Sequence, residues 1–221
     1  MAAAVLFDVD GTLVDTVDLH ARAWQDAFRL YGKEVPFADV RSQIGKGGDQ
    51  LMPVFFSRED LERFGEEMQA RRSRIYRERY QSQVRAFPGV RPLFERLKRS
   101  GKRIALASSA DKEEFDANLS LLGIGDLIDA ATSAHDAARS KPFPDIFDAA
   151  LARLDNVRAE EAVAVGDTPY DAIAASQVGL RTIGMLCGGF PEADLRGAGC
   201  IEIWRDPEDL LSGFEQSALA G

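Results

Sequence analysis

The stretch from Val5 to Asp15 reads Val-Leu-Phe-Asp-Val-Asp-Gly-Thr-Leu-Val-Asp, an apolar run that ends abruptly in two acids and a glycine. Its first three residues are apolar without alternation, which is typical of a strand covered on both faces of a parallel sheet. Such sheets bind their ligands just beyond the carboxyl ends of the strands. Asp8 is the first residue past this strand, so we expect the chemistry of the protein to be centred there.

Asp8 and Asp10 lie two residues apart, so their side chains leave on the same side of an extended backbone. Two carboxylates at that spacing repel each other, and a hard dication such as Mg²⁺, which prefers oxygen ligands, would relieve the repulsion. Gly11 allows the chain to turn, and Thr12 can offer its hydroxyl or amide to an anion. On these residues alone, an acidic turn exposed to solvent is the competing interpretation.

The rest of the chain divides into a helical block and an alternating region. Apolar residues on a helical period predict helices over 16–31, 37–43, 50–56 and 57–81. Beyond Pro88-Gly89, short apolar runs predict strands over 103–107, 127–131, 162–165 and 182–185, with an edge strand over 200–204. Helices are predicted between them, over 91–100, 111–122, 145–154 and 170–178.

This alternation predicts an α/β fold with a doubly wound (Rossmann-like) parallel sheet, because each strand-helix-strand unit places its strands parallel and its helix on one face. We expect residues 1–15 and 83–221 to form the catalytic core and residues 16–82 to form an inserted all-helical cap.

Polar residues follow several of the predicted strands and are therefore expected to meet at one edge of the sheet. Ser108 and Ser109 end one strand, and Asp167 and Asp171 follow another. Lys141 lies between Ser140 and Pro142, where the prolines and the following helix fix the backbone and leave a cation that can reach inward. Each residue also has a plainer interpretation: serines are common in turns, a lysine is commonly solvated, and Asp171 can complement a helix dipole.

The residues Asp8-Val9-Asp10-Gly11-Thr12-Leu13 resemble the first motif of the haloacid dehalogenase superfamily, in its phosphatase and phosphomutase branch. With Ser108, Lys141 and the segment from Asp167 to Asp171, the chain matches the four motifs of that superfamily in order. The resemblance implies that Asp8 is the nucleophile and that Asp10 is the general acid and base. It implies that the phosphoryl group is bound by Ser108 and neutralised by Lys141, with Thr12 and Ser109 as further phosphate-binding candidates. Mg²⁺ would be held by Asp8, Asp167 and the backbone carbonyl of Asp10, with Asp171 acting indirectly or through water.

The start of the helical block, residues 15–24, resembles the β-phosphoglucomutase subgroup, in which a histidine lies near the substrate at the hinge of the cap. That residue is His20 here. The loop of that mutase that carries an arginine is replaced by Gly45-Lys46-Gly47-Gly48-Asp49. We expect Lys46 to contact the part of the substrate remote from its phosphate; solvated side chains are the competing interpretation for both residues.

The resulting functional prediction is a Mg²⁺-dependent phosphatase of small phosphorylated metabolites, similar to phosphoglycolate and sugar phosphatases, that works through an aspartyl-phosphate at Asp8. A β-phosphoglucomutase-like isomerase is the alternative within the enzymes. A phospho-acceptor signalling module is a further alternative, against which stand Asp10 as a proton shuttle and the large helical block.

Composition restricts the partners and the compartment. The 221 residues carry a formal net charge of −9, which argues against a nucleic-acid partner. The two cysteines, Cys187 and Cys200, have no metal-ligand spacing and are predicted to be core thiols of a reducing cytoplasm. No apolar run approaches the roughly 20 residues needed to cross a bilayer, and the first residues do not resemble a secretory signal. We expect a cytoplasmic monomer or weak dimer without membrane partners.

Overall fold

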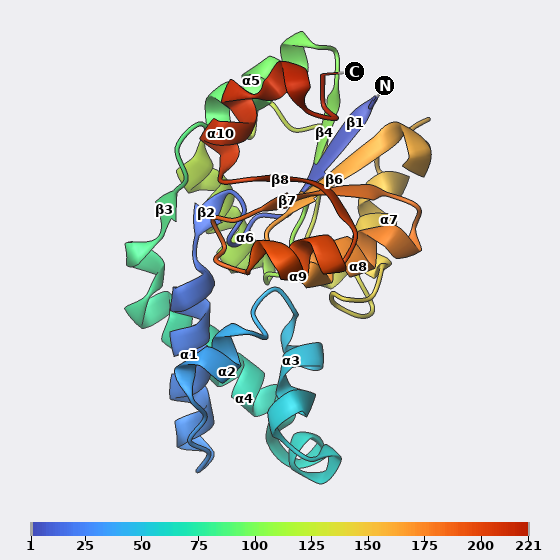
Figure 1. Cartoon of the computed structure of the whole chain (residues 1–221). Coiled ribbons are helices and arrows are strands. Elements are labelled where there is room, and N and C mark those ends of the chain that lie inside the picture. Colours follow the sequence, from blue (N-terminus) through green and yellow to red (C-terminus); the bar gives the residue numbers. More distant parts are fainter. Residues whose placement is uncertain (1, 221) are drawn as a thin grey trace.

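The computed structural model describes residues 2–220 and has an α/β core above a separate block of helices (Figure 1). The core is built on a six-stranded parallel sheet with the order β5-β4-β1-β6-β7-β8. Its strands are β1 (Ala4–Phe7), β4 (Arg103–Ala107), β5 (Ala130–Thr132), β6 (Ala162–Gly166), β7 (Arg181–Met185) and β8 (Cys200–Trp204). The predicted fold class, including the edge strand β8, is confirmed.

The strand β1 lies at the centre of this sheet, and all four of its residues are buried. Phe7 is paired in register with Leu106 of β4 on one side and with Val165 of β6 on the other. The residues that follow these three strands therefore leave the sheet at the same edge. This register brings Asp8 beside the ends of β4 and β6.

Helices cover both faces of the sheet. Alanines of β1, β4 and β6 form one face, against which α7 (Asp145–Ala152) and α8 (Pro169–Gln177) pack. Larger residues such as Phe7 and Ile104 form the other face, covered by α5 (Val90–Arg99), α6 (Lys112–Leu122) and α10 (Pro207–Ser212). The short helix α9 (Glu192–Gly197) contacts β8.

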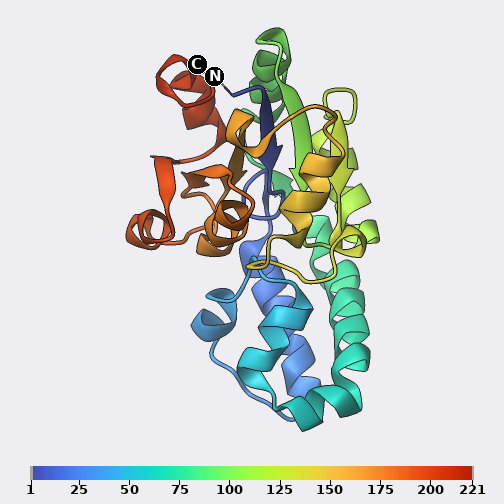
Figure 2. The same ribbon diagram turned by 90° about the vertical axis from the view of Figure 1, so that its right-hand side faces the viewer.

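The helical insertion contains α1 (Val17–Leu30), α2 (Phe37–Arg41), α3 (Gly48–Phe55) and α4 (Arg58–Arg79). Its two long helices, α1 and α4, run side by side, as Figure 2 shows. Phe28 lies at the centre of an aromatic cluster with Trp24, Phe55 and Phe56. Ser57 caps the N-terminus of α4, because its hydroxyl accepts a hydrogen bond from the Asp60 amide.

The chain enters and leaves the insertion through two short strands, β2 (Val14–Asp15) and β3 (Arg85–Ala86), which pair antiparallel. This ribbon was not predicted. The limits proposed for the core and the insertion, at residues 15–16 and 82–83, stay a prediction, although α1 to α4 all lie between β2 and β3.

Other differences from the predicted elements are local. The strand predicted over 127–131 is displaced to Ala130–Thr132, because the Leu127 amide donates to the Ile124 carbonyl and closes a turn there. The sequence did not predict the short helices α9 and α10 or four 3₁₀ turns, at Gln81–Gln83, Ala134–Asp136, Ala159–Glu161 and Phe214–Gln216.

Cys200 is buried and Cys187 is partly buried, and both are free thiols. Within residues 2–220, no helix is long and apolar enough to span a membrane.

Candidate active site

Three buried carboxylates meet where the central strands end. Asp8 follows β1, Asp167 follows β6, and Asp171 lies in the first turn of α8. One oxygen of each lies within 4.8 Å of an oxygen of each of the others. Because β1 and β6 are paired in register, acids separated by more than 150 positions in the sequence are brought together.

Lys141 and Thr12 hold this carboxylate cluster. The Lys141 ammonium contacts an oxygen of Asp8, lies 2.7 Å from Asp171 Oδ1 and donates to the Ala107 carbonyl at 3.1 Å. The Thr12 hydroxyl lies 2.8 Å from Asp167 Oδ1 and 3.4 Å from Asp8 Oδ2. Thr12 thus orients two acids in this structure, and its amide bonds the Val9 carbonyl; a contact between Thr12 and phosphate stays a prediction.

Burial and mutual repulsion change the protonation of the cluster. Burial, partly opposed by Lys141, raises the pKa of Asp8 to about 7, and Asp171 adds to the increase. Burial also raises the pKa of Asp167 well above its usual range, with further increases from Asp8 and Asp171. Burial by itself would lower the pKa of Lys141, but Asp171 and Asp8 raise it above its ordinary value. The site therefore contains one positive charge, on Lys141, and further positive charge would be needed to neutralise the three acids if all were ionised.

The cluster fits a hard divalent cation. Asp167 Oδ2 is fully buried and has no hydrogen-bond partner among residues 2–220. A Cβ on Gly188 would lie 1.8 Å from this oxygen and a Cβ on Gly11 would lie 2.4 Å from it, so glycine is required at both positions. The donor atoms are all oxygens, which suits Mg²⁺. Asp8 and Asp167 are the side chains best placed to hold it.

Unlike Asp167 Oδ2, both carboxylate oxygens of Asp171 lie close to protein nitrogen or hydroxyl groups. One of its oxygens faces Lys141 at 2.7 Å, and the other accepts the Thr168 amide at 3.0 Å and the Thr168 hydroxyl at 2.7 Å. These contacts fix the start of α8 and the position of the lysine. They fit the expectation that Asp171 acts on the cation indirectly, which stays a prediction.

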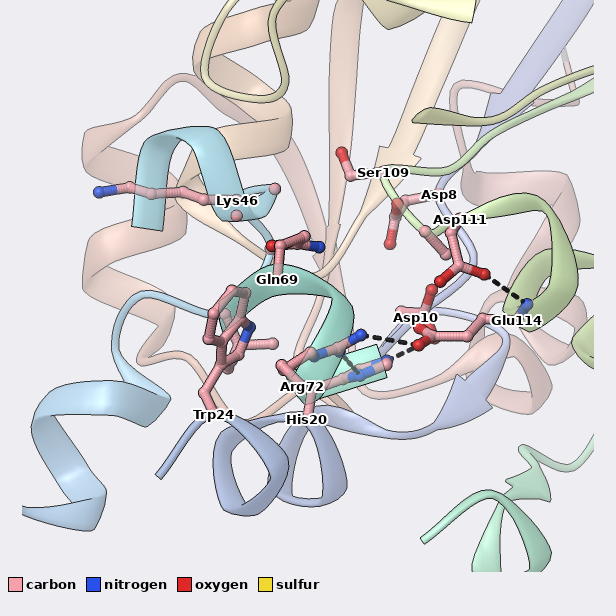
Figure 3. Close-up of a pocket in the computed structure, with 15 residues that line it drawn as sticks. Asp8, Asp10, His20, Trp24, Lys46, Gln69, Arg72, Ser109, Asp111 and Glu114 are labelled. Atoms are coloured by element: carbon pink, nitrogen blue, oxygen red, sulfur yellow. Dashed lines mark hydrogen bonds and ion pairs between the residues drawn. The ribbon is translucent and has the colours of Figure 1, made fainter. Parts of the chain in front are cut away.

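Asp10 lies beside His20 and Arg72 of the insertion (Figure 3). Its Oδ1 accepts hydrogen bonds from Thr16 at 2.9 Å and from Asn118 at 3.1 Å, and it lies 3.0 Å from Nε2 of His20. Burial raises the pKa of Asp10, but the interactions with His20 and Thr16 outweigh burial and leave the pKa below its ordinary value. Although Asp8 and Asp10 are two residues apart, they lie in different environments and are suited to different tasks.

The two serines after β4 lie on the same side of the site. The Ser108 hydroxyl is buried, accepts the Ala110 amide at 3.1 Å and lies 3.5 Å from Asp10 Oδ2. The Ser109 hydroxyl has no partner among the described residues and lines the cavity beside Asp8. Ser109 is thus the serine with an unused hydrogen-bonding group, while the phosphate-binding roles of both serines stay predictions.

A cavity of about 60 Å³ opens beside Asp8 and Asp10 at the junction of the core and the insertion. It adjoins a larger one of about 520 Å³ between α3, α4 and the core loops, since both are lined by Gly47, Gly48, Gln69, Ser109 and Asp111. The Lys46 ammonium points away from Asp8 in Figure 3. It donates to Gln43 at 2.6 Å and lies 4.6 Å from the centre of the Tyr170 ring. Lys46 is one of the residues that line the smaller cavity, and its contact with a substrate stays a prediction.

Sequence reasoning missed four residues that line this cavity, Trp24, Gln69, Arg72 and Glu114. It also missed Asn118, which donates a hydrogen bond to Asp10. Arg72 is one of five arginines between positions 71 and 79, and a run of charged residues on a helix is usually a solvated face. Its buried position on α4 is shared by Met68 and Tyr76, four residues before and after it. This helical spacing was the signal that could have separated Arg72 from its neighbours.

Comparison with known proteins agrees with the geometry. Residues 5–185 match the family of haloacid dehalogenase-like hydrolases. A crystal structure of a hydrolase from Pseudomonas syringae superposes with a TM-score of 0.88 at 28% identity, covering 98% of this chain and 99% of that one. The phosphorylated carbohydrates phosphatase of Thermotoga maritima is 28% identical over 218 residues, covering 96% of this chain and 98% of that protein.

The chloroplastic protein SUPPRESSOR OF QUENCHING 1 of Arabidopsis thaliana is 34% identical over 224 residues, or 97% of this chain. The chain spans only 21% of the length of that plant protein.

The fold and the site define a hydrolase with a parallel-sheet core, a buried acidic centre and a helical insertion. The chain belongs to the haloacid dehalogenase-like hydrolases.

Proposed function

We propose that this enzyme hydrolyses small phosphate monoesters in a Mg²⁺-dependent reaction that passes through an aspartyl-phosphate at Asp8. The observation that carries the proposal is the separation of two roles within three residues. Asp8 lies in the buried cluster with Lys141 and Asp167, where a phosphoryl group can be attacked and its charge neutralised. Asp10 lies outside that cluster, on the side of the cavity from which a leaving group would depart.

The first half of the reaction exchanges one P–O bond for another. The negative charge of a bound phosphate opposes the ionisation of Asp10, so this carboxyl group enters the step protonated although its pKa is low in the free enzyme. An Asp8 carboxylate oxygen attacks phosphorus as the bond to the leaving oxygen breaks, and Asp10 gives its proton to that oxygen. Lys141 balances charge on the transferred group, and a bound Mg²⁺ would add a second positive charge there, held by Asp8 and Asp167. The products are a free alcohol and phospho-Asp8.

The second half restores the enzyme. Asp10, now ionised, takes a proton from a water molecule whose oxygen attacks phospho-Asp8, and the Asp8–phosphorus bond breaks to release inorganic phosphate. Asp10 ends protonated and Asp8 ends as a carboxylate, so both acids are ready for another cycle. The hydroxyl of Ser109 is available for a phosphate oxygen.

The cavities set the size of the substrate. Beyond the space of about 60 Å³ at Asp8, the adjoining cavity of about 520 Å³ lies within the range of small-molecule sites. The name of the Thermotoga maritima relative adds support for a phosphorylated metabolite, since that protein acts on phosphorylated carbohydrates.

Replacement of Asp8 by Asn tests the covalent step. An amide is a poor nucleophile, so we expect Asp8→Asn to lose about 10³-fold or more in kcat with an unchanged circular dichroism spectrum. Acid quench of the wild-type enzyme during turnover should trap phosphate on the peptide that contains Asp8. Turnover by Asp8→Asn above about a tenth of the wild-type rate would contradict the covalent mechanism.

The same preparation distinguishes the alternative activities. Released phosphate across a panel of phosphorylated metabolites indicates the phosphatase. Conversion of β-glucose 1-phosphate to glucose 6-phosphate would indicate an isomerase, and a phospho-Asp8 that persists for minutes without turnover would indicate a signalling module.

A further inference from the structure

The two oxygens of Asp10 differ in their surroundings. Oδ1 accepts from Thr16 and Asn118 and faces Nε2 of His20 at 3.0 Å. Oδ2 has only a contact of 3.5 Å with the Ser108 hydroxyl. A carboxylic proton avoids an oxygen that already accepts several hydrogen bonds, so it resides on Oδ2. The acid therefore works only while its donors hold the carboxyl group in this rotation.

His20 can donate to Asp10 in only one tautomer. A guanidinium nitrogen of Arg72 contacts Nδ1 of His20, and a guanidinium offers donors but no acceptor. Nδ1 must therefore accept, which puts the imidazole proton on Nε2, facing Asp10. The ring plane is fixed as well, because His20 stacks on Tyr76 with a centroid distance of 4.3 Å and an interplanar angle of 13°.

Arg72 is in turn held by the core. Its Nη1 lies 2.7 Å from Oε1 of Glu114, and the two residues are only 7% and 2% exposed. The guanidinium lies 5.5 Å from the Trp24 ring centre and 5.1 Å from the Tyr76 ring centre. Arg72 comes from α4 of the insertion and Glu114 from α6 of the core. The chain of contacts Glu114–Arg72–His20–Asp10 thus crosses from the core to the insertion and back, as the dashed lines in Figure 3 show.

We propose that the buried Arg72–Glu114 pair positions the general acid: it selects the His20 tautomer that donates to Asp10, and it does so only when the insertion is seated on the core. Neither residue needs to exchange a proton with the substrate. The inference rests on the proposed function, because it assigns a partner to the acid of that reaction. Its consequence is that protonation of the leaving group depends on a contact made by the insertion.

The test compares leaving groups in the first half-reaction, with formation of phospho-Asp8 followed by rapid acid quench. An alkoxide such as that from glycerol 3-phosphate needs a proton as it departs, whereas p-nitrophenolate departs without one. We expect Arg72→Met and Glu114→Gln to lose about 10- to 100-fold in the rate with glycerol 3-phosphate, less than the roughly 10²- to 10⁴-fold that a general acid contributes in full. The rate with p-nitrophenyl phosphate should change less than about threefold, and Arg72→Lys should be intermediate with the alkyl substrate.

Removing one partner leaves a buried charge unpaired and can destabilise the protein. A second variant therefore separates a defect in catalysis from a loss of folding. The double variant Arg72→Met/Glu114→Leu removes both charges and should recover the thermal midpoint while keeping the defect with the alkyl substrate. The matched control is Arg71→Met, since Arg71 is the neighbour of Arg72 on α4 but is exposed, pairs with Glu67 of the same helix at 3.8 Å and lies outside the lining of both cavities. This control should leave both substrates unaffected.

Nitrogen NMR of the imidazoles gives a readout independent of activity. Wild-type His20 should show a single Nε2–H tautomer, and Arg72→Met should show a mixture, with His135 as the internal reference. Equal losses with both substrates, or recovery of the alkyl rate in the double variant, would overturn the proposal. If wild-type enzyme formed no phospho-Asp8 from either substrate, the proposed function itself would fail, which is a different result.

Discussion

At the scale of single residues, Asp8 and Asp167 make stability depend on pH in an uncommon direction. Burial holds the pKa of Asp8 at about 7 and that of Asp167 well above its usual range. A carboxyl group with a raised pKa in the folded state binds its proton more tightly there than in the unfolded chain. Folding stability therefore falls as pH rises through the interval between the ordinary pKa and the raised one. The lowered pKa of Asp10 acts below this interval, and Lys141 stays charged throughout it.

We accordingly expect the metal-free protein to melt at a lower temperature at pH 8 than at pH 5.5. Mg²⁺ favours the ionised acids, so it should raise the thermal midpoint more at pH 8, by about 2–4 °C for each kcal/mol gained. Differential scanning calorimetry at both pH values, with Mg²⁺ or with EDTA, measures both effects. Asp167→Asn serves as the control and should reduce both the pH dependence of the thermal midpoint and its increase with Mg²⁺. An increase with Mg²⁺ that is equal at pH 5.5 and pH 8 would contradict the coupling between ionisation of the acids and metal binding.

The Lys46 ammonium lies over the ring of Tyr170 in the core. Replacing Lys46 should therefore weaken the contact between the insertion and the core. A cation over an aromatic ring contributes about 0.5–1 kcal/mol at a partly exposed site. Lys46→Ala should then lower kcat/KM about two- to fivefold for every substrate, and Lys46→Arg should retain the wild-type value. A selective loss of about tenfold or more with a sugar phosphate, and none with acetyl phosphate, would instead support the predicted substrate contact.

The residues that meet at the carboxylate cluster could be predicted from sequence because their positions follow from strand ends. Asp8 and Asp167 directly follow apolar runs, and Lys141 stands between a serine and a proline. The resemblance to β-phosphoglucomutase placed His20 near the substrate, but its contacts with Arg72 and Glu114 could not be predicted, since the three residues come from three different helices. No local pattern encodes how α4 of the insertion lies against α6 of the core.

At the scale of elements, the loop before Lys141 also carries part of the contact between the core and the insertion. Ser140 accepts the Gly47 amide at 2.9 Å and donates its own amide to Asp49 Oδ2 at 3.1 Å, and its hydroxyl contacts Asp49 Oδ1. Gly47 and Asp49 stand at the start of α3. Since Ser140 and Lys141 are adjacent, seating of α3 on the core also restrains the backbone of the lysine that contacts Asp8.

Ser140→Ala removes two of these contacts without touching the carboxylate cluster. Each hydrogen bond contributes roughly 0.5–1.5 kcal/mol, so we expect kcat/KM to fall by about 5- to 100-fold while the thermal midpoint moves little. Hydrogen exchange should become faster in α3. Ser176→Ala is the control, since its hydroxyl bonds only within α8; an unchanged kcat/KM in Ser140→Ala would show that this loop does not restrain the site.

Most elements of the core were predictable because periodic apolar runs bounded by glycine or proline locate them well. The failures occurred where side chains and turns decide the structure locally. The Asp129 carboxylate accepts the Ile104 amide at 2.7 Å, which places a side chain where the predicted strand would have paired. The ribbon of β2 and β3 joins residues about 70 positions apart through two residue pairs, and such short pairing leaves no periodic signal.

At the scale of the whole molecule, the acidic centre should make activity depend on the size of the cation. EDTA should abolish turnover and Mg²⁺ should restore it, because converging carboxylates repel both one another and the incoming phosphate. Ca²⁺ should compete with Mg²⁺ while supporting little turnover, since its longer bonds and looser geometry would displace the attacking oxygen. A phosphate-release assay with each cation checks this, and full activity in EDTA would remove the metal from the mechanism.

The pairing of Asp15 directly opposite Arg85 has a consequence for protein engineering. Facing residues of an antiparallel pair can be joined by a two-residue turn such as Asn-Gly. Residues 16–84 can therefore be replaced by that turn without lengthening the path of the chain through the core. The shortened protein should melt cooperatively and still bind Mg²⁺, while losing turnover of alkyl phosphates more than that of p-nitrophenyl phosphate. Calorimetry and the two assays would show whether the insertion is a detachable module, exchangeable for the corresponding segment of a related hydrolase.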